Sequence, residues 1–396
     1  MFKHLFKLIW NKKKQNFLLI CEMLISFMVM FAVFTMIVNY YQNYKKPMGF
    51  KYNDVWVINF NNAHVFHNTD SMTLYYETVR NVLKSMPQIK EVSFAASNIP
   101  FANSTSTTGF TYKNKKYNYI NRYHAGDDYH KVFDMQVLEG RWFDQQDAAT
   151  AYKSIVINAS FKEMMFGKGK AVGQLIGDDE DKKAKKMRVI GVVTDMKDKG
   201  DYKPSGTAIF SRVDTGMMHY IGQIVIKVAP NSGAAFEGQV YKAMTTTMKE
   251  ASIEIEHLTQ KRDSMNKETL IPIIILLIIA GFLIINVALG LFGVLWYNIN
   301  KRRGEIGLRR AIGASGSAVA GQIVTESMFL ATLSLIIGAF FAVQFPILHV
   351  FDLAASVYIT AIILAIIFIY LLVLACSFYP GRQAAAVYPA VALHEE

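Results

Sequence analysis

The longest uncharged stretch of the chain is residues 269–300, TLIPIIILLIIAGFLIINVALGLFGVLWYNIN. It runs for 32 residues without a lysine, arginine, aspartate or glutamate. A helix needs about 20 apolar residues to cross the hydrocarbon core of a bilayer. A helix buried in a soluble core seldom continues this far without a charge. The stretch therefore predicts a membrane-spanning helix over 269–297 that is long enough to protrude from the bilayer.

Three further windows are nearly free of charge, residues 23–44, 327–351 and 353–381. Since each exceeds the length that a bilayer requires, each predicts a further membrane helix. The four predicted spans are 17–40, 269–297, 318–345 and 356–379.

The composition of the chain excludes several protein classes. Its 396 residues are 52% hydrophobic and 18% charged, whereas ordinary soluble domains are roughly 25% charged. A disordered chain would need low hydrophobicity, so that class is excluded. Two cysteines are too few for a secreted module held by disulfides.

The net charge of +11 reflects two short basic stretches. Residues 1–16 and 297–317 together hold ten basic residues and one acid, or +9 of the total. Basic residues in short loops mark the cytoplasmic side of a membrane. We therefore expect both stretches and the tail 380–396 to be cytoplasmic, and 41–268 to lie outside. The charge indicates orientation, and no nucleic-acid partner is expected.

The N-terminal residues 1–16 have an amphipathic pattern. The apolar residues on one helical face are Phe2, Leu5, Phe6, Ile9 and Trp10. This pattern predicts a helix on the cytoplasmic membrane surface, and the alternative is a frayed terminus. The apolar run that follows is long and lacks a small-residue cleavage motif, so a cleavable signal peptide is not expected.

Residues 41–268 alternate short apolar strands with helices at 71–85 and 232–248. The predicted strands are Val55–Phe60, Val92–Ala95, Ile155–Ile157, Arg188–Val193, Thr207–Phe210, Gln223–Val228 and Ile253–His257, with a hairpin at Tyr112–Tyr123. This order predicts an α/β (α+β) domain with a smaller β-rich insertion near 135–205. The fold class is thus an α-helical integral membrane protein with an α/β domain inserted between helices 1 and 2.

Polar clusters in this domain match no metal or catalytic motif. His64 and His67 lie in an asparagine-rich stretch without further ligands at metal-binding spacing. The acidic run 178–181 precedes lysines and is typical of a solvated hairpin tip. Gly167–Lys170 does not match a phosphate-binding loop. We therefore expect no catalytic residue, cofactor or metal in the chain, and no ATP hydrolysis by the chain alone.

The connection between the second and third predicted helices has the most distinctive sequence, KRRGEIGLRRAIGAS at 301–315. This pattern predicts a short amphipathic helix, because Ile306, Arg309, Arg310 and Gly313 are spaced three or four apart. The orientation rule for basic residues explains the arginines. It does not explain the regular alternation of acidic, basic and small residues.

This stretch resembles a segment of the MacB/FtsX family of ABC transporter permeases, which reads much like R..EIGLRRAIGAS. Three more stretches are similar to the family, namely Gly140–Phe143 with Asp147, VIGVVTD at 189–195 and YPGRQAAAVYPAVAL at 379–393. They follow the family's order, and the resemblance covers nearly the whole chain. It also includes the topology of one helix, a large outer domain and three helices.

The resemblance implies that residues 298–317 form a coupling helix in a groove of a separate cytoplasmic ATPase, which binds ATP and Mg. The residues that it assigns to this contact are Glu305, Ile306, Gly307, Arg309, Arg310, Ala311 and Gly313. In this view the charged residues contact the ATPase and the small ones allow close backbone approach. The resemblance further implies a dimer with a second copy or a related permease. It also implies mechanotransmission, in which closure of the ATPase moves the first two helices and the outer domain.

Polar and small residues inside the predicted membrane helices are few. Those singled out are Glu22, Asn286, Glu326, Gly290 and Gly293. The two carboxylates lie near the cytoplasmic ends of their helices, so packing or coupling roles are favoured over a proton relay. The glycines indicate close helix packing, including at a dimer interface.

Together these features predict a permease subunit in a bacterial inner membrane, surrounded by lipid, with its large domain in the periplasm. By resemblance it exports antibiotics, peptides or toxins with a periplasmic adaptor and an outer-membrane channel. Two alternatives stay open, an FtsX-like regulator of a cell-wall hydrolase and a lipoprotein-releasing permease. A sensor receptor is disfavoured because the longest predicted cytoplasmic stretch is about 20 residues, too short for a signalling domain.

Overall fold

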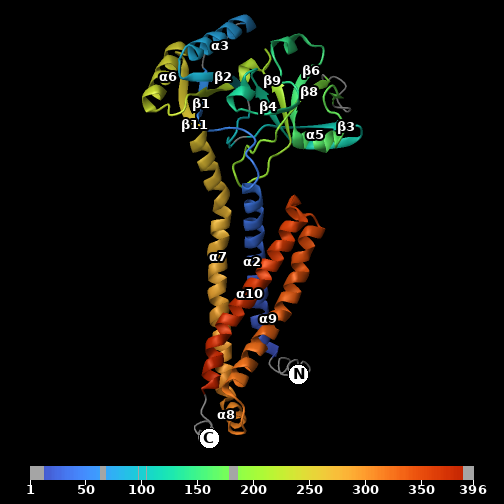
Figure 1. The fold of residues 1–396 in the computed structure, drawn as a ribbon, viewed down its shortest axis with the longest axis vertical. Coiled ribbons are helices and arrows are strands. Elements are labelled where there is room, and N and C mark those ends of the chain that lie inside the picture. The colour runs from blue at the N-terminus through green and yellow to red at the C-terminus, as the bar shows by residue number, and fades with distance from the viewer. Residues whose placement is uncertain (1–12, 63–67, 97, 104, 178–185, 387–396) are drawn as a thin grey trace. The chain divides into compact units, whose positions relative to one another are not determined.

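The computed structural model describes residues 13–62, 68–96, 98–103, 105–177 and 186–386 (Figure 1). Most of the predicted surface helix at 1–16, the pair His64 and His67, the acidic run 178–181 and the end of the tail lie outside these residues. The chain divides into two compact units. One unit is Asn43–Thr269, and the other joins the residues before Asn43 to those after Thr269.

The second unit is helical. Four helices among the described residues are long and apolar enough to cross a membrane, as predicted. Its elements are α2 (Lys13–Tyr44), α7 (Leu258–Lys301), α8 (Arg303–Ala311), α9 (Gly316–Ile347), the 3-10 turn Val350–Asp352 and α10 (Ala355–Ala385). The last residues of α2 and the first turns of α7 belong to the α/β unit. Helix α7 thus begins eleven residues before the apolar stretch that predicted it.

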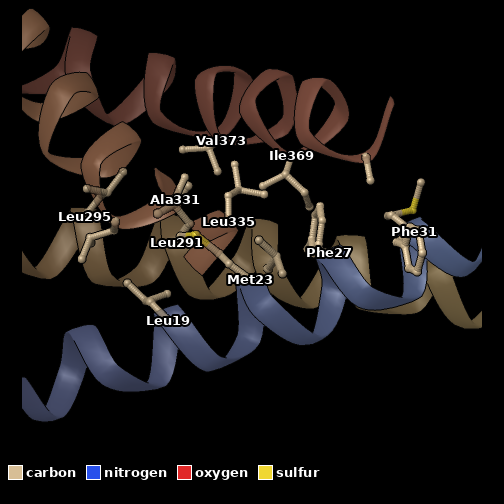
Figure 2. Close-up of a cluster of buried hydrophobic side chains, with 14 of the residues drawn as sticks. Leu19, Met23, Phe27, Phe31, Leu291, Leu295, Ala331, Leu335, Ile369 and Val373 are labelled. Carbon is tan, nitrogen blue, oxygen red and sulfur yellow. The ribbon is translucent and has the colours of Figure 1, made fainter. Parts of the chain in front are cut away.

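A single apolar core joins the four long helices (Figure 2). Helix α2 contributes Leu19, Met23, Phe27 and Phe31, all buried and four residues apart, so they share one face of the helix. They meet Leu291 and Leu295 of α7, Ala331 and Leu335 of α9, and Ile369 and Val373 of α10. At Gly338 of α9 an added Cβ would lie 2.4 Å from the Phe27 ring, so only glycine leaves room for it.

The α/β unit is built on one mixed sheet of eleven strands, whose main path is β11-β1-β10-β2-β4-β9-β6-β8-β5. The strands are β1 (Val55–Asn62), β2 (Ile89–Ala96), β3 (Thr107–Tyr112), β4 (Lys115–Ala125), β5 (Val137–Gly140), β6 (Lys153–Asn158), β7 (Leu175–Ile176), β8 (Met187–Val193), β9 (Ala208–Arg212), β10 (Ile221–Val228) and β11 (Ala251–His257). The helices are α3 (Thr69–Lys84), α4 (Tyr129–Val132), α5 (Ala159–Phe166) and α6 (Ala234–Thr247). Only β4 with β9 and β6 with β8 pair in parallel among the described strands.

The sheet has two halves joined by a narrow pairing. Strands β2 and β4 share just two residue pairs, Ala95 with Ala125 and Ala96 with His124. Figure 1 shows α3 and α6 at one end of the sheet and α5 with β3 at the other. The second half begins at β3, earlier than the predicted insertion near 135–205, because β4 pairs with β9 and carries β3 with it.

Candidate functional site

Helix α8 presents two different faces. Ile306 is 8% exposed and belongs to the core of the helical unit, and Gly307 is buried beside it. Leu308 and Ile312 are 54% and 79% exposed. Ile312 is the C-cap residue of α8, and its amide donates to the Leu308 carbonyl at 3.1 Å, so the two side chains project from the same side, away from Ile306. An exposed apolar pair thus marks the outward face of α8.

The arginines of this segment are bonded within the chain. The guanidinium group of Arg309 donates to Glu305 at 2.6 Å and to Gln322 at 2.8 Å. Arg302 donates to Glu305 at 3.1 Å and lies 3.3 Å from both carboxylate oxygens of Glu326. Gln322 in turn donates to Glu326 at 3.0 Å. These five side chains form a network, the α8–α9 network, that attaches α8 to the start of α9.

Arg310 ties the same helix to α10. It donates to the carbonyl oxygen of Ala385 at 2.9 Å, and Gly316 leaves room for it, since a Cβ there would lie 2.5 Å from the guanidinium nitrogen. The chain reverses at Gly313, whose φ of +104° favours glycine. Ser315 then caps α9 by accepting from the Ala318 amide at 3.2 Å.

The structure shows how the residues assigned to the ATPase contact lie within the chain. Arg309 and Arg310 are both half-buried and bonded to their own chain, and their contact with a partner stays a prediction. Ile306 and Gly307 face the helical core, whereas Ala311 and Gly313 are exposed as a contact role requires. The resemblance assigns mainly charged and small residues to the ATPase contact, and it leaves out Leu308 and Ile312. Their spacing of four residues was the available signal.

The polar residues of the membrane helices are placed in different ways. Glu22 is half-buried and lies against Gly290, where a Cβ would be 2.7 Å from its Oε2. Asn286 turns back onto its own helix and donates to the Phe282 carbonyl at 2.8 Å. At Gly293 a Cβ would meet nothing within 4 Å among the described residues. Close packing within one chain therefore holds for Gly290 and not for Gly293.

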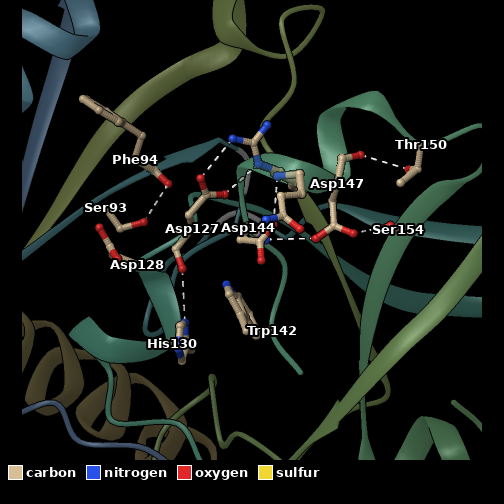
Figure 3. Close-up of polar contacts among 12 residues, drawn as sticks. Ser93, Phe94, Asp127, Asp128, His130, Trp142, Asp144, Asp147, Thr150 and Ser154 are labelled. Carbon is tan, nitrogen blue, oxygen red and sulfur yellow. Dashed lines mark hydrogen bonds and ion pairs between the residues drawn. The ribbon is translucent and has the colours of Figure 1, made fainter. Parts of the chain in front are cut away.

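The family-like stretch at Gly140–Phe143 with Asp147 has a structural role in the α/β unit. Arg141 donates twice to Asp147, at 2.7 and 2.9 Å. Ser154 donates to the same carboxylate at 2.9 Å (Figure 3). Burial would raise the pKa of Asp147, but the bonds from Arg141, the Asp144 amide and Ser154 outweigh it, so the pKa lies below its usual value. These residues brace the turn between β5 and β6.

The stretch at 189–195 ends in a second brace. The Asp195 carboxylate accepts from the Ser160 amide at 2.8 Å and from Asn158 at 2.7 Å. Asn158 itself caps α5 by accepting from the Phe161 amide at 3.1 Å. Aspartate at the start of a helix is favourable because it faces the positive end of the helix dipole. This arrangement is typical of helix capping, and its residues need no ligand to satisfy them.

No group of three or more His, Cys, Asp or Glu side chains that could hold a metal ion occurs within the described parts of the chain.

Comparison with known proteins agrees with this architecture. The family model described as MacB-like periplasmic core domain matches residues 17–240, and the one described as FtsX-like permease C-terminal matches residues 273–389. The first match alone covers more than half of the chain. The chain therefore belongs to the MacB/FtsX-type family of ABC transporter permeases.

Relatives that are 23–24% identical to this chain carry two kinds of name. The "Macrolide export ATP-binding/permease protein MacB" of Neisseria meningitidis is 24% identical over 78% of this chain and 48% of the relative. The MacB 1/2 protein of Paracoccus denitrificans is 24% identical over 56% of this chain and 33% of its own length. The chain thus spans a third to about half of these proteins. The "Uncharacterized ABC transporter permease YvrN" of Bacillus subtilis is 23% identical over 81% of this chain and 79% of its length.

Solved structures include the periplasmic region of MacB from Actinobacillus actinomycetemcomitans, at 17% identity and a TM-score of 0.39 over 57% of this chain and 98% of that one.

Proposed function

We propose that this ABC permease binds a separate cytoplasmic ATPase through α8 and passes ATP-driven movement to its α/β domain. The observation that carries the proposal is the exposed pair Leu308 and Ile312. Apolar side chains one turn apart on a short helix are typical of a helix that seats in a groove of a partner. A charged rim, here Glu305 and Arg309, suits the edge of such an interface.

A coupling helix must also be fixed to the helices that it moves. The α8–α9 network holds α8 to α9 through Arg302, Arg309 and Glu326, and Arg310 holds it to α10. A displacement applied to Leu308 is therefore passed to both helices instead of being absorbed by a flexible loop. In this proposal the arginines act as supports for the docking face.

The proposed setting is the inner membrane of a bacterium, with both termini and α8 cytoplasmic and the α/β domain in the periplasm. The basic stretches 1–16 and 297–317 support this orientation. We propose an efflux role, with a second permease copy or a related permease, a periplasmic adaptor and an outer-membrane channel. A regulator of a cell-wall hydrolase or a lipoprotein-releasing permease fits the same family, and co-purifying periplasmic proteins would distinguish the three.

The docking proposal is tested by co-purification of the tagged full chain from its native host, with and without the double substitution Leu308→Glu and Ile312→Glu. An ABC ATPase and ATP hydrolysis should accompany the wild-type chain and be lost from the double variant. Leu74→Glu is the control, because Leu74 is a leucine on α3 whose exposed fraction of 66% lies between those of Leu308 and Ile312. Equal ATPase recovery from the double variant and the control would overturn the assignment of α8.

A further inference from the structure

Residues 194–202, which follow β8, form an irregular segment that is buried and highly charged. Lys197, Asp198 and Asp201 are 3%, 5% and 5% exposed. Connecting segments normally run over the surface, and buried charges are costly unless they are paired or hydrogen-bonded. Each of these three side chains has such a partner, and the partners lie on different elements of the α/β unit.

The first partner is the end of α2. The Lys197 ammonium group donates to the carbonyl oxygens of Asn43 at 2.7 Å and of Lys46 at 3.4 Å. Carbonyl groups at the C-terminus of a helix lack partners within the helix and carry the negative end of its dipole, so a buried lysine is well suited to bind them. Asn43 also donates to the Tyr202 carbonyl at 3.2 Å, and the rings of Tyr44 and Tyr202 stack at 5.9 Å.

The second partner is the beginning of α7. The Asp201 carboxylate accepts from Arg262 at 2.5 and 3.1 Å and from Asn266 at 2.8 Å. The Asp201 amide in return donates to the side-chain oxygen of Asn266 at 2.9 Å. Arg262 and Asn266 are one turn apart on α7, so both bind Asp201 from the same face of this helix. The guanidinium group also lies 4.8 Å from the centre of the Tyr52 ring.

The residues between these two contacts fix the segment to the core. Asp198 accepts from the Tyr123 hydroxyl at 2.7 Å, and Lys199 donates to the Ala102 carbonyl at 2.8 Å. Gly200 has a φ of +90°, and a Cβ there would lie 2.5 Å from the side-chain oxygen of Asn266. Glycine therefore permits both the turn and the close approach of α7.

We propose that residues 194–202 are a rigid joint that fixes the end of α2 and the start of α7 to each other and to the sheet. Lys197 holds α2 and Asp201 holds α7. The functional meaning of this joint rests on the proposed mechanotransmission, since movement of either helix is then passed to the whole α/β unit. A flexible linker at either position would dissipate that movement.

The test is a distance measurement on the full chain in lipid nanodiscs, without any ATPase. Cys21 and Cys376 are replaced by serine, and spin labels are attached at Gln42→Cys and Lys267→Cys, both exposed positions. The parent should give a narrow distribution of distances. Lys197→Met and Asp201→Asn should each roughly double its width, because the bonds that order these helix ends are lost.

The control is Asp147→Asn. Asp147 is a buried carboxylate of the same unit, and it bonds to Arg141 and Ser154 but not to α2 or α7. This variant should leave the distribution narrow. A second label pair on α3 and α6, Leu74→Cys with Tyr241→Cys, reports whether the unit stays folded. If Lys197→Met does not fold, Arg262→Lys serves instead, since lysine keeps the charge and loses the two-pronged bond.

Unchanged widths in Lys197→Met and Asp201→Asn would overturn the joint. Equal broadening of the distance distributions of both label pairs would also overturn the proposal, because residues 194–202 would then stabilise only the fold of the α/β unit. The result does not depend on the proposed function. If the joint holds and adding the ATPase with ATP leaves the Gln42–Lys267 distances unchanged, the mechanotransmission proposal fails while the joint stands.

Discussion

The carboxylate of Glu22 lies in the space that a side chain at residue 290 would need, because a Cβ on Gly290 would be 2.7 Å from the Glu22 Oε2. Helix α7 can approach α2 at this point only because it carries a glycine there. An acid inside a membrane helix is thus accommodated by the absence of a side chain on its neighbour.

Gly290→Leu should therefore destabilise the helical unit. Overpacking typically costs about 1–3 kcal/mol, and here it would also displace the Glu22 carboxylate. Thermal unfolding of the full chain in detergent should show a lower midpoint. Gly293→Leu is the matched control, since a Cβ at Gly293 meets nothing within 4 Å in the described chain. A Gly293 variant that is as unstable as the Gly290 variant would contradict this explanation.

The α8–α9 network predicts a ranking of two carboxylate substitutions. Glu326→Gln should loosen α8 more than Glu305→Gln, because the Glu326 side chain is 23% exposed and the Glu305 side chain is 46% exposed. Exposed ion pairs typically contribute less than about 1 kcal/mol. Hydrogen exchange at the Ile306 and Ile312 amides should accelerate more in Glu326→Gln. The reverse order would show that α8 is held by other contacts.

Asp147→Asn should destabilise the α/β unit by about 1–3 kcal/mol, the usual cost of weakening hydrogen bonds to a charged buried group. The pKa of Asp147 is depressed in the folded chain, so its contribution is present above the usual aspartate pKa and is lost as pH falls through the folded pKa. Urea unfolding of the chain should lose less stability on acidification in Asp147→Asn than in wild type. If wild type and Asp147→Asn lose the same stability on acidification, the role given to the Arg141–Asp147 pair is contradicted.

His124 predicts a separate pH effect. It is 3% exposed, and burial with nearby Arg122 lowers its pKa to about 4. The unfolded chain binds a proton near pH 6.5 and the folded chain does not, so stability should fall as pH drops from about 6.5 toward 4. In His124→Leu that part of the decline should disappear. An unchanged profile between these pH values would show that His124 is protonated in the folded chain.

Much of the fold could be predicted from the sequence because its signals are local. Four long windows without charge predicted the membrane helices, and the apolar run Val55–Phe60 lies within β1. A hairpin was predicted at Tyr112–Tyr123 with its turn at Asn114 and Lys115. The structure contains one as β3 and β4, but its first strand ends at Tyr112 and its turn is Lys113 and Asn114, both at positive φ. Such features depend on neighbouring residues alone.

Other features depend on residues far apart in the chain and could not be predicted. The parallel pairing of β4 with β9 sets the boundary of the second half of the sheet. The protruding start of α7 was expected, but the bonds that hold it were not, because Arg262 and Asn266 bind Asp201 from far along the chain. Helix α5 was missed because its eight residues carry too weak a periodicity, and its cap Asn158 is held by Asp195.

The same distinction applies to α8. The sequence predicted a helix with a basic face there, and the structure contains α8 at Arg303–Ala311. Arg309 and Arg310 bond within the chain because their acceptors, Gln322 and the Ala385 carbonyl, lie on α9 and α10. Those helices are distant in sequence, so the bonds could not be predicted. Once those arginines are bonded internally, Leu308 and Ile312 remain as the outward apolar surface.

Site-specific photo-crosslinking in the native host tests the central claim most directly. A photoreactive phenylalanine analogue replaces Leu308, and in parallel samples it replaces the buried Ile306 or the exposed Leu74 of α3. We predict a crosslink to an ABC ATPase from position 308 and none from positions 306 and 74. If position 308 gives no such product, or if Leu74 gives an equal amount, α8 is not the ATPase-docking surface of this permease.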